Sequence, residues 1–153
     1  MAGYTTAMPT SFKAELPQAL HNFTTTTGND FKMALGIASP TGTYGAATTN
    51  YSNLTGNSDE VSSSGYSAGG FDFTAANNTT PTTSGTTAYW SWGVNPSWTG
   101  VTFSTGGCII YNASSSNKAV YVGSFGGTQT VTGGTFTVTL PTNNSSNAIL
   151  RIA

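Results

Sequence analysis

From residue 71 onward, the chain consists of short runs in which apolar and polar residues alternate. Alternation with a period of two places the apolar side chains on one face of an extended strand. Seven such runs predict strands over residues 71–75, 86–92, 101–103, 108–111, 119–125, 135–140 and 148–152. Clusters rich in glycine, asparagine and proline separate most of them, and we expect turns or loops at these breaks.

Many short strands joined by turns are typical of a sandwich or a barrel. We therefore predict an all-β fold: a single β-sandwich of seven to eight strands, jelly-roll-like or Ig-like, with one short N-terminal helix. Thr135, Thr137 and Thr139 alternate with apolar neighbours in the most regular run, which predicts an outward-facing threonine stripe. Such a stripe carries no charge and can either stay hydrated or pack against a neighbour.

The N-terminal part of the chain contains the only helical pattern. Phe12, Leu16, Leu20 and Phe23 are spaced by four, four and three residues, which places them on one face of a helix. Pro17 lacks the N–H that would bond a carbonyl one turn earlier. The helix is therefore either kinked at this proline or begins later, with the proline in its first turn.

The segment after this helix is predicted to contain one strand and one long loop. Residues 31–37 alternate clearly and predict a strand, whereas residues 38–70 are rich in glycine and serine and predict a loop with one short strand around residues 59–61. The chain length suits one domain. We divide it into an extended N-terminal arm, residues 1–10, and a β-sandwich domain, residues 11–153. The arm is expected to become ordered when a partner supplies its contacts.

The polar surface of this chain has to come from neutral residues. Thr, Ser, Asn and Gly make up 79 of the 153 residues, whereas nine residues are charged and the formal net charge is −1. A typical soluble domain is about one quarter charged. A neutral surface is covered by another protein at little cost, because no ion has to be stripped of water. The composition therefore favours an assembled, surface-covering protein over an enzyme.

Several classes of partner and location are disfavoured. Nucleic acid is disfavoured as a partner, because its binding needs a clustered basic face. The four cations are scattered along the sequence, at Lys13, Lys32, Lys118 and Arg151. No apolar stretch approaches the roughly 20 residues of a membrane-spanning helix. The N-terminus lacks the basic and apolar regions of a signal peptide, so we expect folding in the cytoplasm. Disorder of the whole chain is not expected, because it contains three Trp, seven Tyr and eight Phe residues.

Few residues offer catalytic or metal-binding chemistry. His21 is the single histidine and Cys108 the single cysteine, and the sequence places no activating partner beside either. Asp59 and Glu60 are adjacent, so on a strand they would point to opposite faces, unlike the paired carboxylates of a glycosidase. We predict no enzymatic activity, no cofactor and no metal site.

One segment contains a cluster of aromatic residues, Tyr89, Trp90, Trp92 and Trp98. On a strand, Trp90 and Trp92 share one face and Tyr89 lies on the other. The rings either belong to the core, which we favour, or form an exposed platform for a protein partner or a sugar. On the second interpretation these four residues are the candidate partner-binding site.

Four stretches of the chain are distinctive: SFKAELPQALHNF, FKMALGIASP, SSSGYSAGGF and residues 108–153. Together they resemble a group of small virion structural proteins of tailed bacteriophages, including phages of cyanobacteria and marine bacteria. The resemblance implies a capsid decoration (cement) protein, located in the virion, that binds and stabilises the assembled head. Its partners would be the major capsid protein and neighbouring copies of itself, as a homo-dimer or homo-trimer on the shell.

Two other functions are compatible with the sequence. The protein could instead be a tail fibre or baseplate component that binds host surface glycans through the aromatic patch. It could also be a non-viral carbohydrate-binding module, although the missing signal peptide counts against that class. Both alternatives require Trp90, Trp92 or Trp98 to lie on the surface.

Overall fold

The computed structural model describes residues 2–153 of the chain. Strands account for 43% of the chain and helices for 11%, which confirms the all-β prediction. The grouping of the strands into the two layers of a sandwich stays a prediction. Residues 2–9 of the expected arm are described, whereas Met1 lies outside the described residues.

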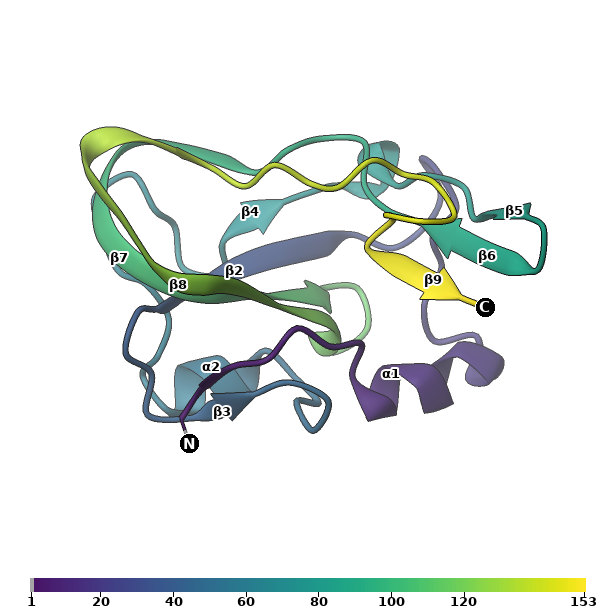
Figure 1. Ribbon diagram of the computed structural model, residues 1–153, viewed down its shortest axis with the longest axis horizontal. Helices are drawn as coiled ribbons and strands as arrows, with labels where there is room; N and C mark the ends of the chain where they lie inside the picture. The colour runs from purple at the N-terminus through teal and green to yellow at the C-terminus, as the bar shows by residue number, and fades with distance from the viewer. Residues whose placement is uncertain (1) are drawn as a thin grey trace.

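An antiparallel sheet of four strands, in the order β4-β2-β7-β8, forms the centre of the molecule (Figure 1). Its strands are β2 (Phe31–Ile37), β4 (Phe71–Asp72), β7 (Ser97–Asn112) and β8 (Lys118–Thr137). The long strands β7 and β8 form a hairpin that curves strongly at the left of Figure 1. One part of this hairpin therefore turns back over the rest of the sheet.

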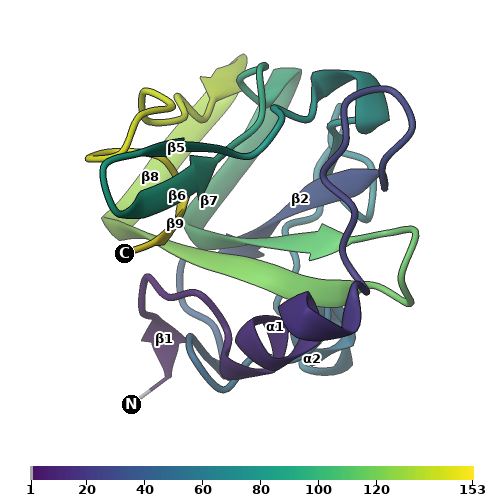
Figure 2. The same ribbon diagram turned by 90° about the vertical axis from the view of Figure 1, so that its right-hand side faces the viewer.

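Two small sheets and short helical segments surround this centre. Strands β5 (Thr82–Ser84), β6 (Thr87–Trp90) and β9 (Leu150–Ile152) form an antiparallel sheet in the order β5-β6-β9 (Figure 2). Strand β1 (Gly3–Tyr4) pairs in parallel with β3 (Thr43–Tyr44). The helical segments are α1 (Thr10–Glu15), α2 (Ser52–Gly56) and the 3-10 segments η1 (Leu16–Gln18) and η2 (Ala75–Asn77).

The long hairpin differs from the prediction of four separate short strands. The glycine pairs at 106–107, 126–127 and 133–134 lie inside β7 and β8 instead of in turns. The pairing register shifts between Thr99 and Val101, where Gly100 has a φ of +70°. A residue with positive φ can bulge out while the pairing continues beyond it, and the bulge bends the strand. These glycines therefore curve two long strands.

The N-terminal helix is shorter than the apolar spacing suggests. Helix α1 ends at Glu15, and η1 follows with Pro17 at its second position. Ala19 then adopts a left-handed conformation, with φ 55° and ψ 30°, and its N–H bonds the carbonyl of Leu16. The proline supplies no N–H to the helix ladder, so the chain turns out of the helix instead of continuing to Phe23.

The expected loop between β2 and β4 contains more structure than predicted. The segment around residues 59–61 does extend the sheet, because Glu60 forms a bridge to Gly36 and the Val61 N–H bonds the Leu35 carbonyl. Helix α2 was not predicted from the sequence. It buries Leu54 completely, and this single apolar anchor is too short a signal for a periodicity argument.

Strand β2 and the C-terminal part of β7 are buried on both faces, and each face has its own core. Met33 and Leu35 of β2 belong to the larger, aromatic-rich core, whereas Ala34 belongs to a smaller core on the opposite face. Likewise, Ile110 of β7 faces the larger core and Ile109 the smaller one. The alternation of apolar and polar residues along these strands is therefore weaker than in a sheet with one hydrated face.

Candidate functional site

The aromatic residues predicted as a possible binding platform lie mainly in the core. Trp90, Trp92 and Trp98 are only 4%, 4% and 6% exposed, while Tyr89 is half-buried. The ring centroids of Trp92 and Phe73 are 4.9 Å apart in a stacked arrangement. The surface interpretation is therefore wrong for the three tryptophans, because their rings fill the larger core. Only Tyr89 of this group keeps substantial exposed surface.

His21 lies in a buried polar cluster at the end of the β7–β8 hairpin. Its Nε2 is 2.8 Å from Glu15 Oε2, and its Nδ1 is 3.0 Å from Asn112 Nδ2. The amide nitrogen of Asn112 can only donate, so the Nδ1 of His21 accepts and its Nε2–H donates to Glu15. Lys118 completes the cluster with its Nζ 2.9 Å from Glu15 Oε1. Both ring nitrogens are thus engaged, and this arrangement holds the chain after η1 against the hairpin.

The electrostatics of this cluster favour a neutral histidine beside a charged pair. Burial lowers the pKa of His21 below its ordinary value of 6.5, and this effect outweighs the attraction of Glu15. Burial alone would raise the pKa of Glu15, but the hydrogen bonds from Lys118 and His21 overcome it and lower that pKa below 4.5. The cluster therefore consists of an ionised Glu15–Lys118 pair and an uncharged imidazole.

This arrangement predicts that the fold loses stability in mild acid. Because the pKa of His21 is lower in the folded state, the unfolded chain takes up a proton at a higher pH than the folded chain. The free energy of unfolding should therefore reach its full value above pH 6.5, where His21 is neutral in both states. It should decrease as the pH drops through the folded-state pKa of His21. Urea unfolding at a series of pH values, followed by tryptophan fluorescence, measures this slope.

The variant His21→Gln provides the control for this prediction. It removes the titrating group, so the pH dependence just below 6.5 should flatten. The separate loss caused by protonation of Glu15, which begins below pH 4.5, should remain. If the free energy of unfolding changes with pH equally in the natural protein and in the variant between pH 6.5 and pH 4.5, the assignment to His21 is wrong.

Asp59 and Glu60 serve two different parts of the fold. Asp59 is completely buried and accepts hydrogen bonds from the Gly42 N–H at 2.8 Å and the Tyr44 hydroxyl at 2.5 Å. Burial raises the pKa of Asp59, but these donors outweigh it and lower the pKa overall. Glu60 instead accepts from the Tyr51 hydroxyl at 2.5 Å. The two carboxylates share no hydrogen-bond partner, and each fixes loop structure.

Cys108 is a buried core residue. Its side chain lies in the larger core, and burial raises the pKa of its thiol to about 12. A thiol with so high a pKa stays protonated and is a poor nucleophile at neutral pH. Among residues 2–153, no group of three or more His, Cys, Asp or Glu side chains is arranged to hold a metal ion.

The strongest candidate for a functional surface is a row of hydroxyl groups on the β7–β8 hairpin. Three cross-strand pairs expose Ser or Thr side chains on the same face, and we call them the hydroxyl face: Ser97 with Thr137, Thr99 with Thr135, and Ser104 with Thr130. The hydroxyl oxygens are 2.9 Å apart in the first pair and 2.8 Å apart in the third. These side chains hold one another in place and present a regular, uncharged surface.

The predicted threonine stripe contains two residues of this face, Thr135 and Thr137. Thr139 lies beyond the end of β8, and Thr130 was not predicted. On β7 the exposed Ser and Thr residues are at positions 97, 99, 102 and 104, so their alternation changes phase at the Gly100 bulge. The opposite face of the same strand buries Trp98, Val101 and Phe103. Allowing one extra residue at the glycine would have revealed the second half of the row.

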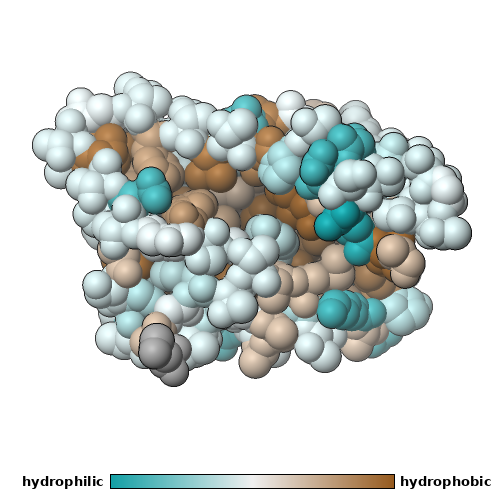
Figure 3. Space-filling view, viewed as in Figure 1, coloured by the Kyte–Doolittle hydropathy of each residue, from teal (hydrophilic) through white to brown (hydrophobic). Residues whose placement is uncertain are grey.

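An apolar hollow lies on the other side of β8 from the hydroxyl face, because Phe136 alternates with Thr135 and Thr137 and packs against the buried Phe103. Figure 3 shows apolar side chains gathered in a recess of the molecule. A cavity of about 340 Å³ is lined by Phe125, Phe136 and Val138, and Thr137 and Thr139 also border it. A smaller cavity of about 120 Å³ shares Phe125 and Val138 with it. The hollow and the hydroxyl face meet at Thr137, and neither contains a charged residue.

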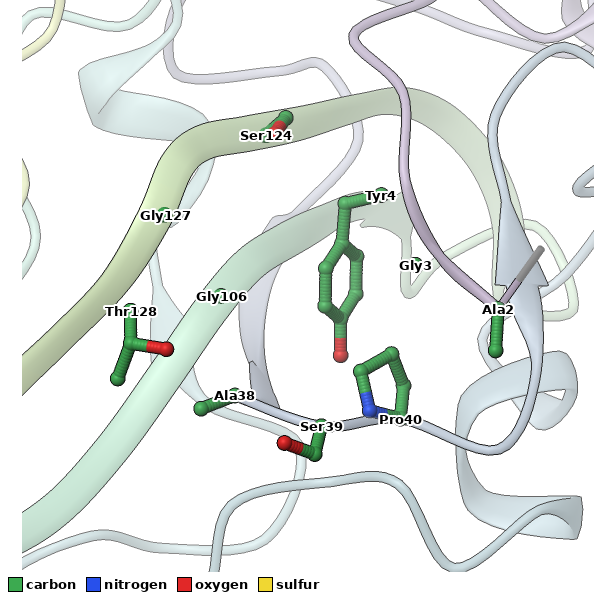
Figure 4. Close-up of a pocket in the computed structure, with 10 residues that line it drawn as sticks. All are labelled: Ala2, Gly3, Tyr4, Ala38, Ser39, Pro40, Gly106, Ser124, Gly127 and Thr128. Atoms are coloured by element: carbon green, nitrogen blue, oxygen red, sulfur yellow. The ribbon is translucent and has the colours of Figure 1, made fainter.

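The N-terminal arm packs on its own domain. The backbone of Ala7 bonds that of Val122 in both directions, at 3.0 and 2.9 Å. The Tyr4 ring lies over glycine-rich backbone, and its hydroxyl donates to the Ile37 carbonyl at 3.0 Å. Figure 4 shows this ring between β7, β8 and the loop at Pro40. The described part of the arm is therefore ordered without a partner, which differs from the expectation of ordering on docking.

Comparison of the sequence and structure with protein-family models, curated proteins and solved structures gave no match. Within residues 2–153, no helix combines the length and apolar character needed to cross a bilayer.

Proposed function

We propose that this protein is a structural component of a tailed-phage virion, specifically a capsid decoration protein. In this role it binds the major capsid protein and neighbouring copies of itself and strengthens the assembled head. The role is mechanical and requires no catalytic group, cofactor or nucleic acid. The resemblance of the sequence to small virion proteins suggests this class, and the neutral surface supports it.

The observation that carries this proposal is the absence of charge from one large part of the molecule. Between Asp72 and Arg151 the single charged residue is Lys118, which pairs with Glu15. The hydroxyl face and the apolar hollow both lie in this region. Covering them strips no ion of water, while the hydroxyls can donate and accept hydrogen bonds. Many copies on a lattice add such modest contacts into firm attachment.

The tail-component alternative is not proposed. It depended on exposed tryptophans for glycan binding, and the tryptophans are buried in the core. Tyr89 alone, half-buried on β6, is a small surface for stacking a sugar.

Co-sedimentation with empty capsids tests the proposed function. Purified protein should pellet with the capsids in a saturable way, and a virion reconstruction should show many copies on the shell. A protein that stays in the supernatant at every concentration, or that is found in a few copies at the tail, would contradict the proposal.

A charge placed on the hydroxyl face should weaken this attachment. We expect Thr135→Lys to lower the affinity for capsids about tenfold or more, because an unpaired ammonium would have to be buried. Thr83→Lys is the matched control, since it adds the same charge to an exposed residue of β5. Equal affinity of the two variants would show that the hydroxyl face is not the interface.

A further inference from the structure

Two of the four cationic side chains form no ion pair within residues 2–153, and both lie at the same groove. The other two are paired: Lys32 Nζ lies 3.4 Å from Asp72 Oδ2, and Lys118 Nζ lies 2.9 Å from Glu15 Oε1. Lys13 and Arg151 form no salt bridge within the described residues. They nevertheless line one groove of about 550 Å³, between α1 and β9, although they come from opposite ends of the chain. In a protein with so few charges, this convergence marks a distinct surface.

The walls of this groove are apolar. Met8 and Leu16 are half-buried and pack against the larger core, and Ile152 completes the lining from β9. Ile152 is 48% exposed and is the one large apolar side chain with this degree of exposure in residues 2–153. Figure 3 shows this region, over α1 and β9, as apolar surface between strongly hydrophilic groups. Burying an exposed apolar side chain of this kind against a partner is favourable, because it removes apolar surface from water.

The groove also borders an unpaired strand edge. Strand β9 is the last strand of the sheet β5-β6-β9 and pairs only with β6 among the described strands. In Figure 1 strand β9 lies above α1, and residues of both elements line the groove. An open edge presents N–H and C=O groups that can pair with another extended chain.

Arg151 is held in place beside this edge. Its Nη1 donates to the Ser146 carbonyl at 2.6 Å and to the Ser145 carbonyl at 3.3 Å. These bonds fix the guanidinium but do not neutralise it, because carbonyl oxygens carry no net charge. No Asp or Glu side chain lines the groove, and although Ala153 also borders it, neither Lys13 nor Arg151 forms a salt bridge with its terminal carboxylate. A carboxylate from a partner could therefore pair with both cations.

We propose that the groove between α1 and β9 binds an extended, acidic segment of a partner protein. The segment adds a strand to the free edge of β9 and places an apolar side chain against Met8, Leu16 and Ile152. Its carboxylates pair with Lys13 and Arg151. The main-chain pairing supplies affinity, and the two cations select for acidic sequence. This proposal is independent of the hydroxyl face and of the virion role.

A synthetic peptide of alternating glutamate and valine residues tests the proposal with the full chain. Fluorescence anisotropy should show saturable binding that weakens as salt is added. A peptide with lysine in place of glutamate should bind about tenfold more weakly or worse. Hydrogen exchange should show new protection of β9 amides when the acidic peptide is bound, which a merely electrostatic contact would not produce.

Variants on the two sides of the groove identify the residues responsible. Lys13→Gln should weaken binding of the acidic peptide several-fold, whereas Lys32→Gln removes the same charge elsewhere and should leave it unchanged. Ile152→Ser should weaken binding of both peptides. Melting curves would confirm that each variant is folded. Lys13→Gln leaves unchanged the backbone bond from the Lys13 N–H to the Pro9 carbonyl at the start of α1.

Three outcomes would overturn the proposal. Equal binding of the acidic and basic peptides would remove the role of the cations. If Lys13→Gln and Lys32→Gln weaken binding of the acidic peptide equally, the binding site is not this groove. Self-association that is abolished by Ile152→Ser, without any peptide binding, would show that a second copy of this chain occupies the edge.

Discussion

Trp92→Ala is expected to lower the free energy of unfolding by about 3 to 5 kcal/mol, the range for truncating a large buried aromatic side chain. The Trp92 ring lies 4.9 Å from that of Phe73, 5.6 Å from that of Phe31 and 6.3 Å from that of Phe23, measured between centroids. These neighbours belong to paired strands and packed loops that cannot close the cavity. Urea unfolding followed by circular dichroism measures the loss.

Two controls separate a core role from a surface role. Trp92→Phe should cost far less, because it keeps an aromatic ring and the indole N–H has no hydrogen-bond partner to lose among the described residues. Tyr89→Ala, at a half-buried position, should cost about 1 kcal/mol. A Trp92→Ala variant as stable as the natural protein would contradict the core assignment.

Gly70→Ala is expected to lower the free energy of unfolding by about 2 to 5 kcal/mol. Gly70 has a φ of +81°, which costs other residues about 1–2 kcal/mol. A Cβ atom there would also overlap the Met33 carbonyl oxygen and lie 2.7 Å from the Ala34 Cα. Both atoms belong to the backbone of β2, which β7 holds on its other side. Overpacking of this kind typically adds 1–3 kcal/mol.

Gly85→Ala is the matched control for the contact. Gly85 also has a positive φ, +58°, but a Cβ atom there would meet nothing within 4 Å. It should therefore cost only about 1–2 kcal/mol, and the difference between the variants isolates the close approach to β2. Equal losses in urea unfolding would show that β2 shifts to accommodate the added methyl group.

The regular strands were the most predictable part of the fold. Strand β2 has the predicted bounds, and β9 lies within the predicted run at the C-terminus. Period-two alternation is a property of the strand itself, so the local sequence is sufficient to show it. The lengths of β7 and β8 were not predictable, because a glycine pair suits a turn and a bulge equally well. Only the presence of a partner strand decides between them.

The candidate surfaces were predicted in part. The threonine stripe identified Thr135 and Thr137 of the hydroxyl face, but not Thr130, and the Gly100 bulge concealed the β7 half. The aromatic cluster attracted attention for its composition, which cannot distinguish a core from a binding platform. The groove at Lys13 and Arg151 left no local signal, since its two cations lie at opposite ends of the chain.

By itself, the sequence determined that this chain forms strands and that its surface is nearly free of charge. Both follow from residue type and short-range spacing. The tertiary structure decided which strands pair, which side chains of the aromatic cluster are enclosed, and where the few charges meet. Those outcomes depend on packing between segments far apart in the chain, and no local backbone preference specifies such contacts.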